Sequence, residues 1–276
     1  MTMNNAPIFH IACAFGLHGP SLTISNACAS SSMAIGEGLR WIQSGVADVV
    51  VVGGAEAMLT PCIIRAWQGL TVLAPADEQD TRRSCKPFSA DRNGIVLAEG
   101  ASALVLERAD HAKARGATQY AQISGYATSL DSTHLSRPHP AGQSRAMINA
   151  LRMADISPND VGYINAHGTG TYVGDAVEVN SICIAFGSDG GQIPVSSTKA
   201  LHGHMMGAAG ATEFIAAILA MQHDFIPPTA HLDKPDPEFG LDFVANAGRN
   251  TVGLNCVMSN SFAFGGANSV LVAQRI

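Results

Sequence analysis

Hydrophobic and polar positions alternate along the chain between short strand-like runs and longer helix-like runs. Residues 48–52 are nearly continuous β-branched sequence, which predicts a strand buried on both faces. Residues 205–222 are apolar almost all round and predict a buried helix. Asp175 and Glu178 have the spacing of a capping box that opens a helix. The other predicted strands are 21–25, 103–107, 122–126, 162–166, 195–198, 256–261 and 269–273, and the other predicted helices are 28–44, 144–153 and 175–187.

This alternation of strands and helices indicates an α/β fold. A strand, a short polar turn and a buried helix follow one another at residues 22–32 and again at 195–211. We therefore expect two similar parts, residues 1–109 and 110–276, whose strand-to-helix turns face one crevice.

Composition narrows the classes of function. The net charge is −6, so no basic surface is expected to hold nucleic acid or an anionic membrane. No continuous apolar run approaches the roughly 20 residues of a bilayer span, and no secretory signal is visible. The six cysteines lack disulfide-type or C-x-x-C spacing, which favours reduced thiols. We expect a soluble, cytoplasmic protein.

The start of the chain has an unusual charge pattern. No Lys or Arg precedes Arg40, and the only charged side chain before it is Glu37. The first residues of a domain are usually polar and loosely held, whereas this segment resembles the interior of a fold. Two interpretations stay open: an unusually apolar N-terminus, or a chain that begins partway through a larger domain.

Cys28 lies directly after a predicted strand and at the start of a predicted helix. The unpaired backbone N–H groups and the helix dipole at such a position favour a thiolate. A lowered thiol pKa makes a cysteine a nucleophile, so Cys28 is the candidate nucleophile. The other cysteines lack this placement and are interpreted as packing residues: Cys13, Cys62, Cys85, Cys183 and Cys256.

Two histidines also follow predicted strand ends. His167 precedes Gly168-Thr169-Gly170-Thr171, a turn that lets the backbone approach a ligand closely. His204 begins the predicted buried helix, and with Cys28 the two histidines form a candidate catalytic constellation. His202 and His204 could suggest a metal pair, but no further ligand occurs at a recognisable spacing, so we expect no metal.

Four motifs, in this order, resemble those of the β-ketoacyl-acyl-carrier-protein synthases, the elongating ketosynthases of the thiolase superfamily. They are ACASS at 27–31, NAHGTGT at 165–171, STKALHGH at 197–204 and NSFAFGG at 260–266. The resemblance implies an α/β, thiolase-like fold in α-β-α-β-α layers, with five strands ordered 3-2-1-4-5 in each half. It also implies that the first half is incomplete, with its first two strands missing, so that strand 48–52 loses a neighbour.

The resemblance implies a role for each matching residue. Cys28 would take an acyl chain from its carrier as a thioester. His167 and His204 would stabilise the enolate that forms as a malonyl group loses CO2. The backbone N–H groups of Cys28 and Phe264 would form a second oxyanion hole, and Phe264 would act as a gate between the acyl and malonyl pockets.

Two further residues match supporting positions of the family. Lys199 matches its active-site lysine, and Glu213, within an apolar helix, matches its buried carboxylate. Because an unpaired buried charge is costly, we expect both in one polar network that orients the histidines. The resemblance implies no cofactor.

The implied partner is an acyl carrier protein, loaded with acyl or malonyl groups, and the implied assembly is a homodimer that joins across residues 21–25. Carrier proteins are acidic, so docking would require a local basic patch. The candidates for it are Arg65, Arg82, Arg83 and Lys86.

The leading hypothesis is therefore decarboxylative Claisen condensation in fatty-acid or polyketide synthesis. Two alternatives stay open: a truncated, catalytically idle ketosynthase that serves as an interaction subunit, and a thiolase-like acyltransferase, which His204 disfavours.

Overall fold

The computed structural model describes residues 3–276, apart from the side chains of residues 188 and 189. In this part of the chain the strands form a small sheet, β1-β2, a larger sheet ordered β3-β10-β9-β4-β5-β7, and a short pair, β6-β8. The strands are β1 Val49–Glu56, β2 Gly100–Glu107, β3 Gln122–Leu130, β4 Tyr163–Asn165, β5 Pro194–Ser196, β6 Phe225–Ile226, β7 Asp242–Phe243, β8 Arg249–Asn250, β9 Cys256–Phe262 and β10 Ala267–Gln274. The helices are α1 Ala6–Phe15, α2 Ser30–Gln43, α3 Pro61–Gly69, α4 Ala109–Ala114, α5 Pro140–Ala154, α6 Tyr172–Phe186, α7 Lys199–His202 and α8 Ala209–His223.

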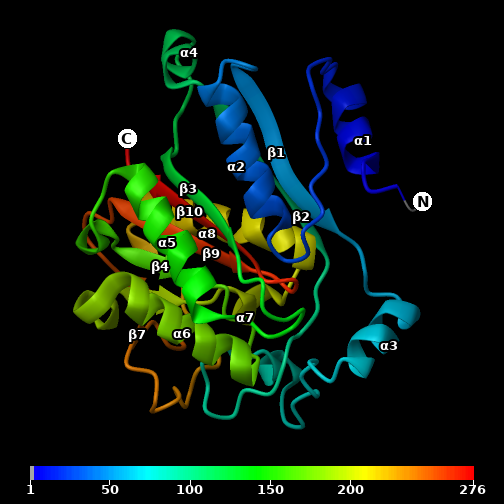
Figure 1. The fold of residues 1–276 in the computed structure, drawn as a ribbon, viewed down its shortest axis with the longest axis vertical. Coiled ribbons are helices and arrows are strands. Elements are labelled where there is room, and N and C mark those ends of the chain that lie inside the picture. The colour runs from blue at the N-terminus through cyan, green and yellow to red at the C-terminus, as the bar shows by residue number, and fades with distance from the viewer. Residues whose placement is uncertain (1–2) are drawn as a thin grey trace.

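The main elements stack in layers (Figure 1). α5 and α6 cover one face of the larger sheet and share a core with Ile164, Val195 and Val270. α2 and α8 lie between the larger sheet and β1-β2, where Ile35 and Phe214 are fully buried. The layers are therefore α-β-α-β, four of the five layers that the resemblance to a thiolase-like fold implies. Within residues 3–276, no helix buries the outer face of β1-β2.

The larger sheet corrects the expected strand order. Taken along the chain as strands one to five, β3, β4, β5, β9 and β10 lie in the order 3-2-4-5-1 rather than 3-2-1-4-5. Both orders place β9 beside β10, which form an antiparallel pair. The orders differ because β4 pairs in parallel with β9 and takes the position expected for β3. β10 then separates β9 from β3, which becomes an edge strand.

Residues 21–25 do not form the predicted strand. They have no ladder partner within the described chain, and Leu22 is 53% exposed. A strand needs a neighbour to satisfy its N–H and C=O groups, and β1 pairs only with β2. The predicted burial of residues 48–52 on both faces is also wrong, because Val49 and Val51 are exposed while Val52 is buried.

The other predicted strands overlap β2, β3, β4, β5, β9 and β10, and the predicted helices overlap α2, α5, α6 and α8. α1 and α3 were not expected; each carries a proline in its first turn, a position where proline favours helix initiation. Of the helices in residues 3–276, none has the length and apolar character that crossing a bilayer requires.

Candidate active site

Cys28 lies in the turn that leads into α2. Ala27 has φ of 46°, in the left-handed region that non-glycine residues rarely adopt. This sharp turn directs the chain into the helix immediately after the cysteine. The side chain of Cys28 is 5% exposed and lines a cavity.

The Cys28 thiol is not the thiolate that its position predicts. Burial raises the pKa of Cys28 from 9.0 to about 12, because desolvation penalises the charged form. Lys199 and the backbone N–H groups of Cys28 and Phe264 lower this pKa, but by less than burial raises it, and Glu213 also raises it. The expected lowering is therefore wrong: the apolar surroundings outweigh the helix terminus.

His204 contacts the thiol directly, with Nε2 3.0 Å from Cys28 Sγ. Its backbone is held by the stretch before β2: the N–H of His204 donates to the Val96 carbonyl at 2.7 Å, and the N–H of Ala98 donates to the His204 carbonyl at 2.9 Å. His204 precedes α8 rather than beginning it, since a 3-10 turn at Met206–Ala208 intervenes. The long segment between β1 and β2 thus fixes one catalytic candidate.

His167 lies beside His204, with ring centroids 5.3 Å apart and the rings at 83°. The backbone N–H groups of His167 and Gly168 donate to the two carboxylate oxygens of Glu178 at 2.8 and 2.7 Å. Asn260 Nδ2 donates to the same carboxylate at 3.2 Å. The buried Glu178 side chain therefore holds the His167 loop.

These contacts overturn the predicted capping box. α6 begins at Tyr172, and its N-cap is Thr171, whose hydroxyl accepts from the N–H of Gly174. Asp175 accepts instead from the N–H groups of Gly170 and Phe88 at 3.1 and 2.7 Å. Its carboxylate is turned towards the loop because that loop offers several buried N–H donors.

Lys199 and Glu213 form a fully buried ion pair, with Nζ 2.5 Å from Oε1 and both side chains at 0% exposure. Lys199 Nζ also lies 3.2 Å from His167 Nδ1. Burial raises the pKa of Glu213 to about 7, and Lys199 offsets part of that rise. The structure thus brings both supporting residues into one chain of contacts with His167.

Both imidazoles are held as Nε2–H donors. An ammonium group can only donate, so His167 Nδ1 accepts from Lys199 and the proton of the neutral ring lies on Nε2. The backbone N–H of Met206 donates to His204 Nδ1 at 3.3 Å, with the same consequence. Burial, and then Lys199, lowers the pKa of both histidines well below 6.5, which keeps the rings neutral.

This hydrogen bonding also bears on metal binding. Ligand atoms of Cys28, His167 and His204 lie within 4.8 Å of one another, a spacing that a metal ion could bridge. A metal requires a free nitrogen lone pair, whereas the contacts at both Nδ1 atoms leave protons on Nε2. The donor set therefore fits a developing oxyanion better than a cation.

The cavity around these groups measures about 330 Å³. Phe264 and Trp67 line it, and their rings stack at 5.9 Å. Arg137 also lines it and makes no ion pair with any residue in the described part of the chain. The site thus combines one thiol, two N–H donors, an aromatic wall and an available cation.

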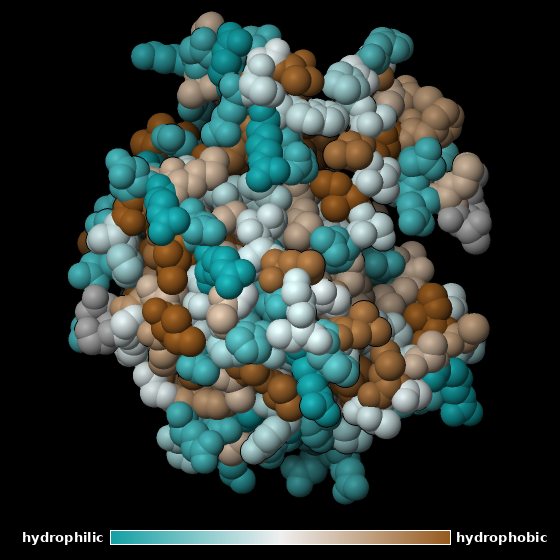
Figure 2. Space-filling model, in the orientation of Figure 1, coloured by the Kyte–Doolittle hydropathy of each residue, from teal (hydrophilic) through white to brown (hydrophobic). Residues whose placement is uncertain are grey.

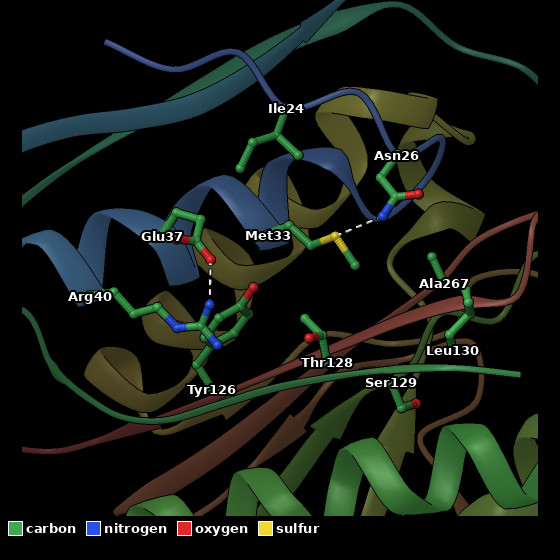
Figure 3. Close-up of a pocket in the computed structure, with 10 residues that line it drawn as sticks. All are labelled: Ile24, Asn26, Met33, Glu37, Arg40, Tyr126, Thr128, Ser129, Leu130 and Ala267. Carbon is green, nitrogen blue, oxygen red and sulfur yellow. Dashed lines mark hydrogen bonds and ion pairs between the residues drawn. The ribbon is translucent and has the colours of Figure 1, made fainter. Parts of the chain in front are cut away.

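A second hollow of about 430 Å³ lies between α2 and β3 (Figure 3). Its walls include Met33 and Tyr126, and the Arg40–Glu37 ion pair, 2.6 Å long, spans one side. Its lining contains none of the candidate catalytic residues. We therefore place the chemistry in the smaller cavity.

The expected basic patch is largely neutralised within the chain. Arg82 pairs with Asp80 at 2.8 Å, and Arg83 pairs with Asp233. Lys86 lies between Asp77 and Asp91, at 3.0 and 3.2 Å. Acidic neighbours thus cancel the charges that made these three residues candidates.

The prediction that the other cysteines are packing residues is wrong for three of them, because Cys13, Cys62 and Cys183 are exposed.

Comparison with known families fits this geometry. Residues 2–112 match the N-terminal domain of β-ketoacyl synthases, and residues 120–233 match their C-terminal domain. The chain belongs to the β-ketoacyl synthase family.

Similar proteins include nodulation protein E of Rhizobium leguminosarum bv. trifolii, 43% identical over 99% of this chain and 66% of that protein. 3-Oxoacyl-[acyl-carrier-protein] synthase 2 of Staphylococcus aureus (strain COL) is 42% identical over 94% of this chain and 63% of its own length. The chain thus spans about two thirds of the length of these relatives.

Solved ketosynthase structures share the fold. A β-ketoacyl synthase from Burkholderia phymatum STM815 superposes with a TM-score of 0.94 at 36% identity, covering 100% of this chain and 66% of that one. A type II polyketide ketosynthase in complex with its acyl-carrier protein superposes with a TM-score of 0.96 at 33% identity, covering 99% and 67%. The thiolase-like fold class is therefore confirmed.

The sequence interpretation missed three contributors to the candidate site. Glu178 was taken only as a helix cap, although an acid one turn into an otherwise apolar helix signals a buried role. Trp67 comes from a segment without predicted structure. The Met206 backbone N–H carries no sequence signal at all, because any residue but proline supplies that group.

Proposed function

We propose that this chain carries the catalytic centre of a β-ketoacyl synthase that performs decarboxylative Claisen condensation with malonyl-carrier thioesters. In the first step, Cys28 sulfur attacks the carbonyl carbon of an acyl-carrier thioester. The bond from that carbon to the carrier sulfur breaks, and the thiol proton passes to the carrier sulfur. N–H groups of Cys28 and Phe264 stabilise the oxyanion of the tetrahedral intermediate.

In the second step, a malonyl thioester loses CO2, and the electron pair of the broken C–C bond forms an enolate. The Nε2–H groups of His167 and His204 donate to the enolate oxygen. The enolate carbon then attacks the acyl carbonyl on Cys28, the thioester bond to Sγ breaks, and the sulfur regains a proton from water. Neutral imidazoles suffice, because their role is to donate hydrogen bonds rather than to abstract a proton.

The observation that carries the proposal is the 3.0 Å contact between Cys28 Sγ and His204 Nε2, with His167 beside it as a second neutral donor. The condensation requires a thiol for acyl transfer and two hydrogen-bond donors for the enolate in the same place. Cys28, His167 and His204 line one cavity. Two histidines also disfavour the thiolase-like alternative.

The deciding experiment is malonyl-thioester decarboxylation and condensation by the wild type and by Cys28→Ala. We expect Cys28→Ala to lose condensation but retain decarboxylation, since the imidazole donors remain. Cys62→Ala, on exposed α3, is the matched control and should keep both activities. Retained condensation in Cys28→Ala would refute the proposed nucleophile.

The second candidate is a catalytically idle ketosynthase that serves as an interaction subunit. The apolar outer face of β1-β2 favours it, because within residues 3–276 that face is exposed, and an exposed apolar face is a surface for contact. Under this hypothesis neither the wild type nor Cys28→Ala decarboxylates a malonyl thioester.

The proposed partner is an acidic acyl carrier protein, as in the polyketide ketosynthase complex, and the proposed assembly is a homodimer. With Arg82, Arg83 and Lys86 paired internally, Arg137 is the better cation for a carrier at this cavity. The proposal covers condensation in both fatty-acid and polyketide synthesis.

A further inference from the structure

α5 carries one polar side chain on its inward face that the proposed chemistry does not use. Gln143 is 2% exposed and lines the cavity that also holds Cys28. The outward face of the same helix carries the exposed Arg145 and Arg152, and Figure 2 shows hydrophilic residues at the surface over α5. Gln143 therefore lies away from the hydrated side of its helix and beside the candidate active site.

One end of the Gln143 amide is held by α6. Ser181 Oγ donates to Gln143 Oε1 at 2.8 Å and also to the Val177 carbonyl at 2.6 Å. Ser181 is 0% exposed, so its hydroxyl proton is shared between these two acceptors. Because the amide is planar, fixing Oε1 against α6 sets the direction in which the two N–H bonds of Nε2 point.

The other end of the amide has no partner in the described chain. Within residues 3–276, Gln143 Nε2 makes no hydrogen bond, although buried polar groups are normally bonded. Two other buried side chains of the cavity wall are engaged: Asn268 Nδ2 donates to Asp131 at 2.7 Å, and Glu178 accepts from the N–H groups of three residues. Gln143 therefore presents two unused donors to the cavity.

The chemistry of an amide N–H group restricts what it binds. Such a group only donates, so its partner must be an acceptor such as a carbonyl or carboxylate oxygen. In the proposed substrate, a malonyl thioester, the thioester oxygen belongs to His167 and His204, which leaves the malonyl carboxylate and the amide carbonyls of the thiol arm. A neutral donor orients a carboxylate without the strong ground-state stabilisation that a cation would bring. That stabilisation would raise the barrier to CO2 loss.

We propose that Gln143 is a specificity-determining residue of the condensation site, whose Nε2–H group donates to a second acceptor oxygen of the malonyl thioester. This inference rests on the proposed function, because it assigns a further contact to the same substrate. The acceptor is a carboxyl or amide oxygen, supplied by the malonyl carboxylate or by the thiol arm. A substrate without that oxygen leaves a buried donor unpaired, so the site discriminates against it.

The experiment compares decarboxylation of two malonyl thioesters by the wild type and by Gln143→Met. Malonyl-N-acetylcysteamine has an amide in its thiol arm, and malonyl S-pentyl thioester does not. Gln143→Met keeps the length of the side chain and removes the donor, so kcat/KM for malonyl-N-acetylcysteamine should fall about tenfold. The alkylation rate of Cys28 should stay the same, because the thiol is untouched. Gln119→Met, at an exposed position, is the matched control and should react as the wild type does.

The second substrate identifies the source of the acceptor. If the malonyl carboxylate accepts, Gln143→Met loses the same factor with both thioesters; if the thiol arm accepts, the loss disappears with the S-pentyl thioester. Ser181→Ala, which frees Oε1, should show the same substrate pattern with a smaller loss, and it decides the matter if Gln143→Met does not fold.

The outcomes separate this inference from the proposed function. Unchanged kcat/KM in both variants beside an active wild type overturns the inference alone. A loss that is accompanied by an altered rate of Cys28 alkylation reports a distorted site and overturns it too. A wild type that decarboxylates neither thioester overturns the proposed function, and this inference with it.

Discussion

The raised pKa of Cys28 predicts an unusual pH dependence of its alkylation. A shift from 9.0 to about 12 lowers the thiolate population about a thousandfold at pH 8. A thiolate of higher pKa is intrinsically more nucleophilic. With a Brønsted coefficient near 0.5, the rate constant of the thiolate rises about 30-fold, which offsets part of the smaller population. Cys28 should therefore react with iodoacetamide about 30-fold more slowly than a free cysteine at pH 8.

The assay follows the Cys28 peptide by mass spectrometry between pH 7 and pH 10. The rate should rise about tenfold per pH unit without a plateau, because the pKa lies above this range. Limited access through the cavity lowers every rate equally, so the slope is the diagnostic quantity.

Two variants test the sign of the electrostatic causes. Glu213 raises the pKa of Cys28, so Glu213→Gln should accelerate alkylation, whereas Lys199 lowers it, so Lys199→Met should slow alkylation. A plateau near neutral pH, or a reaction faster than that of free cysteine at pH 7, would refute the reasoning. Either result would mean that the helix terminus, and not burial, sets the ionisation of this thiol.

Four further predictions concern the groups around the thiol. Glu213→Leu leaves Lys199 buried and unpaired, so it should cost about 3–5 kcal/mol in denaturant unfolding, whereas Lys199→Met/Glu213→Leu should recover most of that loss. Glu178→Gln presents an amide N–H2 to backbone donors and should slow malonyl decarboxylation at least tenfold while leaving the alkylation rate unchanged. Gly168→Ala, at φ 28° and against packed neighbours, should lower the melting temperature by several degrees. Arg137→Glu should raise the KM for carrier-bound acyl groups but not for a small acyl thioester.

Much of the fold and of the candidate site is readable in the sequence because it is encoded locally. Hydrophobic period and flanking turn residues locate β9, β10 and α8. The start of α2 locates Cys28, and the turn between β4 and α6 locates His167. These features depend on a few adjacent residues, so a single sequence contains them. The predicted strand at residues 21–25 is wrong for the opposite reason. Its pattern is strand-like, but a strand also requires a neighbouring strand to pair with.

The pKa of Cys28 and the protonated nitrogen of His204 could not be predicted from the sequence, because both depend on residues distant along the chain. Cys28 has the helix-terminal position of an activated thiol, yet its pKa is set by how completely the fold excludes water around it. The protonated nitrogen of His204 is likewise fixed by the backbone of Met206. Both properties arise only when the two parts of the chain pack together.

The distance between the thiol and the imidazole is itself set by small side chains at the junction of α2 and α8. A Cβ added at Gly210 would lie 2.9 Å from both Ser32 and Ser261, closer than real side chains approach. Ser31 Oγ accepts from the N–H of Ala211 at 2.9 Å, so the helices touch through a serine and backbone atoms. Larger residues there would push the two helices apart, and the turns before them carry Cys28 and His204. The 3.0 Å contact between Cys28 and His204 therefore requires small residues directly after the cysteine, because larger side chains on α2 would separate it from α8.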